Sequence, residues 1–240
     1  MNIKIYDNDN DLIKALAQAV CDAAIEAISA RGQFNFVLSG GSSPRKLYKL
    51  LASDPFKKQI DWEKTYFFFG DERFVPQGDS QRNSLMAKKA LFDPLKIPKS
   101  HIFKVDTTGS PEQAAKKYAE SIAAHFQKPP VEFDFLLLGI GDNAHTASLF
   151  PHTDVLDATE ATIKSVFVKE VNMYRITMTA PLINQAKHIA FLVFGKDKSE
   201  AVFQILEDKK GSASQFPARL INSDDNKVVW YLDTEAASRL

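Results

Sequence analysis

FDFLLLGIGDNAHTASLFP, residues 133–151, combines an apolar run with a glycine-containing loop, and this combination decides what kind of fold to expect. The loop matches G-x-G-x-x-A, which after a strand is the fingerprint of a dinucleotide-binding turn. Such a site also needs a full helix whose N-terminus faces the pyrophosphate. Only a turn or two fits between His145 and Phe150 before Pro151, a residue that disrupts a helix interior. The stretch therefore predicts a buried strand and a loop that presents side chains, and it disfavours a dinucleotide site.

The order of strand, loop and helix recurs along the chain. FNFVL is followed by SGGSS and PRKLYKLL, where Ser43 is the expected helix cap and Pro44 the first helical residue. TYFFFG leads into DERFVP and the helical SLMAKKALF, and HIAFLVFG leads into KDKSEAVFQILED. Two further helices are predicted, over about residues 11–30 and from Ser110 to about Phe126. Because strands that alternate with helices favour a largely parallel sheet covered on both faces, we expect one α/β domain over residues 1–240.

Composition disfavours several classes of protein. The 240 residues, 45% of them hydrophobic, are enough for a substantial core. The 30 basic residues balance the 30 acidic ones, so no global field favours nucleic acid or an anionic membrane as a partner. The single cysteine rules out a disulfide within the chain, and we find neither a secretory signal nor an apolar run of about 20 residues. We expect a cytoplasmic protein whose anion sites are local.

Four loops that follow predicted strands concentrate the side chains capable of chemistry. They cover residues 39–43, 70–73, 139–145 and 195–198. In open parallel sheets, ligands bind beyond the carboxyl ends of the strands. We therefore expect the functional site where these loops meet.

SGGSSPR has the composition of an anion-binding turn. Backbone N–H groups of Gly40, Gly41, Ser42 and Ser43 at a helix N-terminus can hold a phosphate, and Arg45 adds a charged fork. An ordinary strand-to-helix turn explains the same residues equally well. The motif is not a Walker loop, since no G-K-[ST] follows.

Other charged residues stand in or beside predicted strands. Asp71 and Arg73 in GDERFVP suit the rim of an active site, although charges there also pair with each other or face solvent. Arg175 lies in YRITMT, a strand-like segment in which polar and apolar residues alternate. A surface ion pair is the simpler interpretation of Arg175, and a second anion-binding side chain in the site is the alternative. Lys198 stands at a predicted helix start and opposes the helix dipole, which hints at an anionic ligand.

His145 is the one histidine of five that lies in a glycine-bearing loop after a predicted strand. With an ordinary pKa of about 6.5, a histidine can act as general base and activate water near neutral pH, although lone histidines more often have structural roles. Metal binding is disfavoured, because His152 lies beyond Pro151 and neither H-E-x-x-H nor a cysteine pair occurs. A serine nucleophile lacks its G-x-S-x-G signature, so we interpret Ser148 as a helix or loop hydroxyl.

Taken together, these motifs resemble those of bacterial 6-phosphogluconolactonases, within the wider group that includes glucosamine-6-phosphate deaminases. GGSSPRKLYKLL is similar to the family's GGSTP phosphate loop, and GDERFVP with the later Asn83 resembles its D-E-R-x-V-P segment. LLLGIGDNAHTASLFP is similar to LLG-x-G-x-D-G-H-T-A-S-L-F-P. RITMTAPLIN, GKDKSEAV and PARLI follow in the family's order, so the resemblance covers nearly the whole chain.

The resemblance implies a Rossmann-like fold of the sugar-phosphate isomerase type and hydrolysis of 6-phospho-D-glucono-1,5-lactone in the oxidative pentose phosphate pathway. It implies a small sugar-phosphate lactone as partner and neither a metal nor an organic cofactor. His145 takes the place of the family's catalytic histidine, and Arg45 and Arg175 that of its phosphate or substrate contacts. We assign Asp71 and Arg73 to substrate hydroxyls or to ordering of their loop.

Beside Ser43 in place of the family's threonine and Arg82 in place of its serine, a departure in the histidine loop matters most, since Asn143-Ala144 replaces an Asp-Gly pair. Asn143 can hydrogen-bond a histidine, but it stabilises an imidazolium less well than a carboxylate does. Ala144 disfavours a left-handed backbone there. Either the loop tolerates the β-carbon or the neighbouring Asp142 substitutes for the missing aspartate.

Two other functions stay open. A deaminase or isomerase acting on an amino-sugar phosphate would use Asp71 as proton-abstracting base, and a non-catalytic sugar-phosphate sensor is conceivable because of Asn143-Ala144. Phe150 stands where the deaminases carry an acidic residue, which favours the lactonase. Monomer and small homo-oligomer are both compatible with the sequence.

Overall fold

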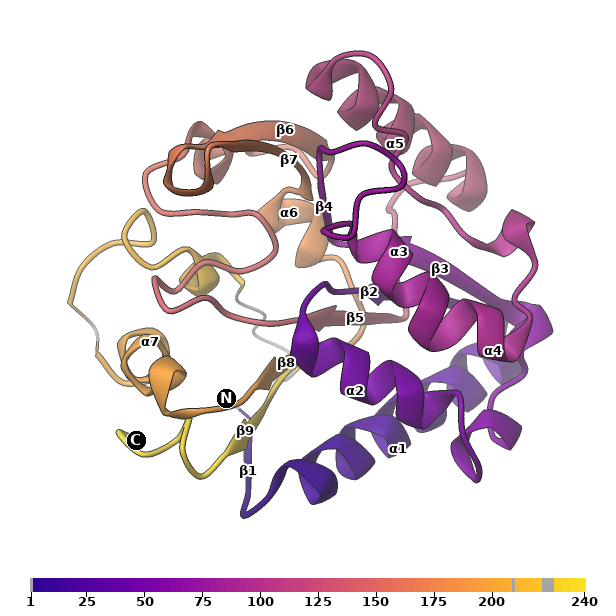
Figure 1. Ribbon diagram of the computed structural model, residues 1–240, viewed down its shortest axis with the longest axis horizontal. Helices are drawn as coiled ribbons and strands as arrows, with labels where there is room; N and C mark the ends of the chain where they lie inside the picture. Colours follow the sequence, from indigo (N-terminus) through magenta and orange to yellow (C-terminus); the bar gives the residue numbers. More distant parts are fainter. Residues whose placement is uncertain (1, 209, 222–226) are drawn as a thin grey trace.

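A six-stranded sheet forms the centre of the computed structural model, which describes residues 2–208, 210–221 and 227–240 (Figure 1). Every neighbouring pair in this sheet is parallel, in the order β1-β9-β8-β5-β2-β3. The strands are β1 (Asn2–Tyr6), β2 (Phe34–Leu38), β3 (Thr65–Phe69), β5 (Phe135–Leu138), β8 (Ile189–Val193) and β9 (Val228–Asp233). The three central strands β2, β5 and β8 are buried along their whole length, which explains their uninterrupted apolar sequences.

Helices from the first part of the chain cover one face of the sheet (Figure 1). They are α1 (Asp9–Arg31), α2 (Ser42–Leu51), α3 (Asn83–Ala87), a π-helical turn (Lys88–Phe92) and α4 (Asp93–Leu95). Asn8 caps α1 by accepting a hydrogen bond from the backbone of Asp11, and Gly32, in the left-handed conformation, ends that helix. Buried Phe36 and Leu38 of β2 point into this side of the core.

The other face is covered by α5 (Pro111–Phe126), α6 (Ala180–Ile183), α7 (Ser199–Leu206) and a second, smaller sheet. That sheet is antiparallel, in the order β4-β7-β6, with β4 (Asp71–Arg73), β6 (Ile163–Val168) and β7 (Met173–Met178). The short 3-10 turns are Phe56–Lys58, Trp62–Lys64, Lys99–His101, Asp154–Asp157, Lys169–Val171, Lys196–Lys198 and Pro217–Leu220. The predicted α/β fold with a mostly parallel central sheet and helices on both faces is confirmed.

The order in which the chain adds strands to the sheet reverses between β2 and β5, and this reversal determines where the loops of the site lie. The chain leaves β2 towards β3 on one side and later returns to β5 on the other. Such a switch point opens a crevice beyond the carboxyl ends of the two diverging strands, where α/β proteins bind ligands. The loops after β2 and β5 flank this crevice. They are the two glycine loops singled out in the sequence.

The prediction that Ser43 caps α2 is wrong. The cap is Gly41, at a φ of 108°, and the helix already begins at Ser42, with no side-chain cap. After β5 the chain forms turns up to Pro151 instead of a helix, which agrees with the argument against a dinucleotide site. Within the described residues, no helix is both long and apolar enough to cross a membrane.

Candidate active site

A cavity of about 340 Å³ lies at the carboxyl edge of the sheet, over the switch point between β2 and β5. Its volume is within the range of small-molecule sites. Three of the four predicted loops contribute to its wall, and the hairpin between β6 and β7 completes it. The residues that line the cavity include Gly40, Asp71, Arg73, Asn83, Asn143, His145, Phe150, Glu170 and Arg175.

His145 is fixed in this cavity by contacts on three sides. Its ring stacks on Phe150, with centroids 3.8 Å apart and planes 16° from parallel. Its Nδ1 lies 2.6 Å from Oδ1 of Asn143, and its backbone carbonyl accepts a hydrogen bond from the N–H of Gly141. No partner of the other ring nitrogen, Nε2, is found in the described part of the chain. The ring is held rigidly, with Nε2 available for chemistry.

The loop tolerates the β-carbon of Ala144, and Asp142 does not replace the missing aspartate. Ala144 is completely buried and adopts the left-handed conformation, with φ 61°, a position that glycine occupies with less strain. Asp142 turns back to accept the N–H of Asn143 at 3.0 Å, and Asn143 itself contacts the His145 ring. The amide therefore occupies the place expected of the family's carboxylate.

Burial lowers the pKa of His145 to about 4. Nearby charges have smaller effects on this pKa. Asp71 raises it and Arg175 lowers it, and Asp142 and Lys198 do the same, in that order, to a lesser extent. Because burial penalises the charged imidazolium, the ring stays neutral above about pH 4. A neutral imidazole is the form that can accept a proton at pH 7.

We expect the ring resonances of His145 to titrate with a midpoint near pH 4 in the unliganded protein, because burial disfavours the imidazolium. Proton NMR across pH 3.5–8 measures this midpoint, and a His145→Asn variant assigns the signal by its loss. A midpoint at or above the ordinary value of about 6.5 would show that the cavity does not desolvate the ring.

Asp71 is held by two side chains that come from elsewhere in the sequence. Its Oδ2 accepts a hydrogen bond of 2.6 Å from Oγ of Ser148, 77 positions away, and its Oδ1 accepts one of 3.1 Å from Nδ2 of Asn83. The Asn83 side chain lies directly over Gly40, where any β-carbon would overlap it. Ser148 is thus more than a loop hydroxyl, and no local pattern indicates a contact across so many residues.

Arg73 and Arg175 stand side by side across β4 and β7. Side chains alternate along a strand, so Asp71 and Arg73 share a face of β4 while Glu72 points to the other. Arg175 is 9% exposed, and neither an ion pair nor a side-chain hydrogen bond for it is found within the described residues. The Nε atoms of both arginines are buried, and neither has a hydrogen-bond partner among the residues described. Directly opposed like charges destabilise a sheet, so this arrangement suits an anionic ligand.

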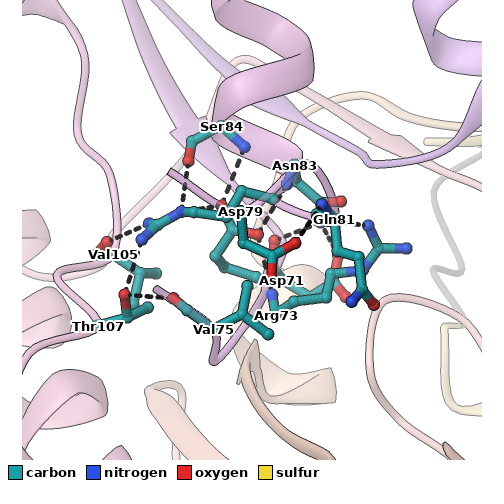
Figure 2. Close-up of polar contacts among 11 residues, drawn as sticks. Asp71, Arg73, Val75, Asp79, Gln81, Asn83, Ser84, Val105 and Thr107 are labelled. Atoms are coloured by element: carbon teal, nitrogen blue, oxygen red, sulfur yellow. Dashed lines mark hydrogen bonds and ion pairs between the residues drawn. The ribbon is translucent and has the colours of Figure 1, made fainter. Parts of the chain in front are cut away.

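The third residue of the D-E-R motif, Glu72, has a structural position. It is fully buried, and its carboxylate accepts the backbone N–H groups of Asn83 and Ser84 at the start of α3 and pairs with Arg82 at 3.6 Å. Arg82 in turn donates to Val105 and Thr107 (Figure 2). This network ties α3 to β4 and thereby positions Asn83 against Asp71.

The remaining predicted residues lie outside the cavity wall. Gly41, the N-cap of α2, is exposed, and on the first turn of that helix Ser42 and Arg45 are exposed and Ser43 is half-buried. Lys198 pairs with Asp197 at 3.0 Å, yet it is close enough for its charge to influence His145. No cluster of three or more metal-binding side chains was found in the ranges described.

Comparisons with known proteins give one consistent result. The family model for glucosamine-6-phosphate isomerases/6-phosphogluconolactonase matches residues 7–230. A 6-phosphogluconolactonase of Synechocystis is 37% identical over 242 residues, covering 99% of this chain and 98% of its own length. One from Haemophilus influenzae is 37% identical and covers 85% of both chains. The structure of 6-phosphogluconolactonase from Trypanosoma brucei, 26% identical, superposes with a TM-score of 0.84 over 100% of this chain and 98% of that one.

Proposed function

Because this chain belongs to the glucosamine-6-phosphate isomerase/6-phosphogluconolactonase family, we propose that it is a 6-phosphogluconolactonase, a carboxylic ester hydrolase of carbohydrate metabolism. The reaction is hydrolysis of 6-phospho-D-glucono-1,5-lactone to 6-phospho-D-gluconate, a step of the oxidative pentose phosphate pathway. The observation that carries this proposal is a desolvated, neutral His145 facing a cavity that also holds Arg175, a cation with no ion pair among the residues that the structure describes.

We assign the substrate phosphate to the cationic side of the cavity. Gly40 and Arg175 line the same space, and α2 begins at Ser42, just after Gly40, with no side-chain cap found in the described residues, so its first backbone N–H groups can bind an anion. The positive charge of Lys198, which lies outside the cavity wall, also lowers the pKa of His145. Arg45, exposed on α2, would have to turn towards the phosphate to contact it.

His145 is the proposed general base. Its Nε2 takes a proton from water as the water oxygen attacks the lactone carbonyl, which breaks the carbonyl π bond and gives a tetrahedral oxyanion. The oxyanion then collapses, the bond to the ring oxygen breaks, and the imidazolium returns the proton to that oxygen. Asp71, held by Ser148 and Asn83, favours the transient imidazolium, because its charge raises the pKa of His145. Arg73 is assigned to the substrate hydroxyls.

The environment of His145 disfavours the deaminase alternative. Phe150 is 6% exposed, and its ring covers one face of the imidazole, where it excludes water. A deaminase with a carboxylate at this position would have a charged partner there instead. A glucosamine-6-phosphate deaminase that is 22% identical superposes with a TM-score of 0.84, but this likeness concerns the fold alone.

Acid release from freshly generated 6-phosphogluconolactone tests the proposal, and we expect the protein to accelerate it well above the spontaneous rate. Ammonia release from glucosamine 6-phosphate is measured in parallel and should stay at background. Ammonia release without lactone hydrolysis would establish the deaminase instead. Tight binding of the sugar phosphate in calorimetry without either reaction would establish the sensor.

A further inference from the structure

Asn143 connects His145 to a carboxylate on the far wall of the cavity. Its Oδ1 lies 2.6 Å from Nδ1 of His145, and its Nδ2 donates to Oε2 of Glu170 at 2.8 Å. Glu170 belongs to the 3-10 turn Lys169–Val171, which joins β6 to β7. Neither the loop motif nor the sequence around Glu170 indicates this contact, because the two residues are 27 positions apart.

Two independent neighbours fix which way the Asn143 amide points. An ionised carboxylate can only accept hydrogen bonds, so Glu170 must face the NH₂ group. The backbone N–H of His145 can only donate, and it lies 3.2 Å from the same Oδ1 that faces the ring. Both contacts therefore require the oxygen of the amide to face His145.

This orientation fixes the tautomer of His145. Because Oδ1 is an acceptor, the nitrogen 2.6 Å away must carry a proton, so the neutral ring has its hydrogen on Nδ1. The lone pair is then on Nε2, the nitrogen that must accept the proton of the attacking water. A flipped amide would present N–H to Nδ1 and favour the opposite tautomer, which has no free lone pair at Nε2.

We propose that Glu170 is a positioning residue: through Asn143 it holds His145 in the tautomer that can act as a base. An aspartate at position 143 would accept from Nδ1 with either oxygen and would need no such support. An amide has two inequivalent ends, so it needs a second residue to select one. Glu170 performs that selection in this chain. The catalytic consequence rests on the proposed function, whereas the tautomer itself does not.

Two substitutions of Glu170 distinguish the effect of its hydrogen-bond acceptor from the effect of its side-chain size. Glu170→Met keeps the length but removes the acceptor, and Glu170→Gln keeps an acceptor oxygen. Long-range ¹⁵N–¹H NMR at pH 7.5 distinguishes the two neutral tautomers of His145 in the unliganded protein. We expect the Nδ1–H form in the wild type and in Glu170→Gln, and a mixture of tautomers in Glu170→Met.

Turnover should follow the tautomer. We expect Glu170→Met to lower kcat about five- to tenfold, the range of one lost hydrogen bond, and Glu170→Gln to lose less than threefold. KM should stay constant or fall in Glu170→Met, because a negative charge leaves a cavity that binds an anion. A general loss of structure would raise KM as well.

The Asn143→Asp background provides the decisive control. There Glu170 would face a second carboxylate, so adding Glu170→Met should leave kcat equal to or above that of Asn143→Asp alone. Equal kcat values for Glu170→Met and Glu170→Gln, or a loss from Glu170→Met that persists beside Asn143→Asp, would overturn the proposal. If the wild type hydrolyses no lactone, the proposed function fails, and the tautomer spectrum alone decides this inference.

Discussion

Replacing His145 with asparagine should lower kcat for 6-phosphogluconolactone about 10²- to 10⁴-fold, the range attributed to a general base. Asparagine has polar atoms at a similar distance from the backbone, but it cannot accept a proton from water at neutral pH. The cationic side of the cavity is left intact, so we expect KM to change much less than kcat. Initial rates at pH 7, corrected for spontaneous hydrolysis, measure the effect.

His152→Asn is the matched control for this substitution. His152 is exposed, lies seven residues further along the same segment and has a φ of 58°, a conformation that asparagine adopts readily. We expect its kcat to be that of the wild type. If His145→Asn also retained a rate within threefold of the wild type, His145 would not be the base, and Asp71 would become the first alternative.

Repeating patterns along the chain were sufficient to predict the sheet and the meeting of its loops. β2, β5 and β8 are apolar along their full length because both faces are covered, and each is followed by a loop rich in glycine or charge. Parallel strands bring their carboxyl ends to one edge, so loops 39–43, 70–73 and 139–145 had to meet there. His145 and Asp71 could be singled out on this basis alone.

Contacts between distant segments could not be predicted in the same way. The antiparallel pairing of β4 with β7 sets Arg73 opposite Arg175, and nothing in GDERFVP or YRITMT indicates that register. This pairing is why Arg175 is buried in the cavity wall rather than paired at the surface, as its sequence context suggested. The bond from Ser148 to Asp71 has the same origin, since three-dimensional packing brings them together.

The His145 ring occupies the space beside Gly141 that a side chain at that position would need, whereas there is room for a β-carbon beside Gly139. A β-carbon at Gly141 would overlap Nδ1 and Cε1 of His145 and would lie 3.0 Å from Oδ1 of Asn143. At Gly139 the nearest atom to such a carbon is the carbonyl oxygen of Leu192, at an ordinary 3.8 Å. Neither glycine has a positive φ, so alanine strains the backbone at neither position. The two residues therefore form a matched pair that differs in the contact with the ring.

Gly141→Ala should lower kcat about 100-fold, the cost associated with moving a catalytic group by roughly 1 Å. The imidazole must leave its stack on Phe150 or its hydrogen bond with Asn143 to make room for the new methyl group. Gly139→Ala should keep kcat within about threefold of the wild type, since van der Waals contact alone is added. Steady-state kinetics with thermal unfolding of both variants separates ring displacement from unfolding. A Gly141→Ala variant with wild-type turnover would mean that His145 works from a different position than the one described.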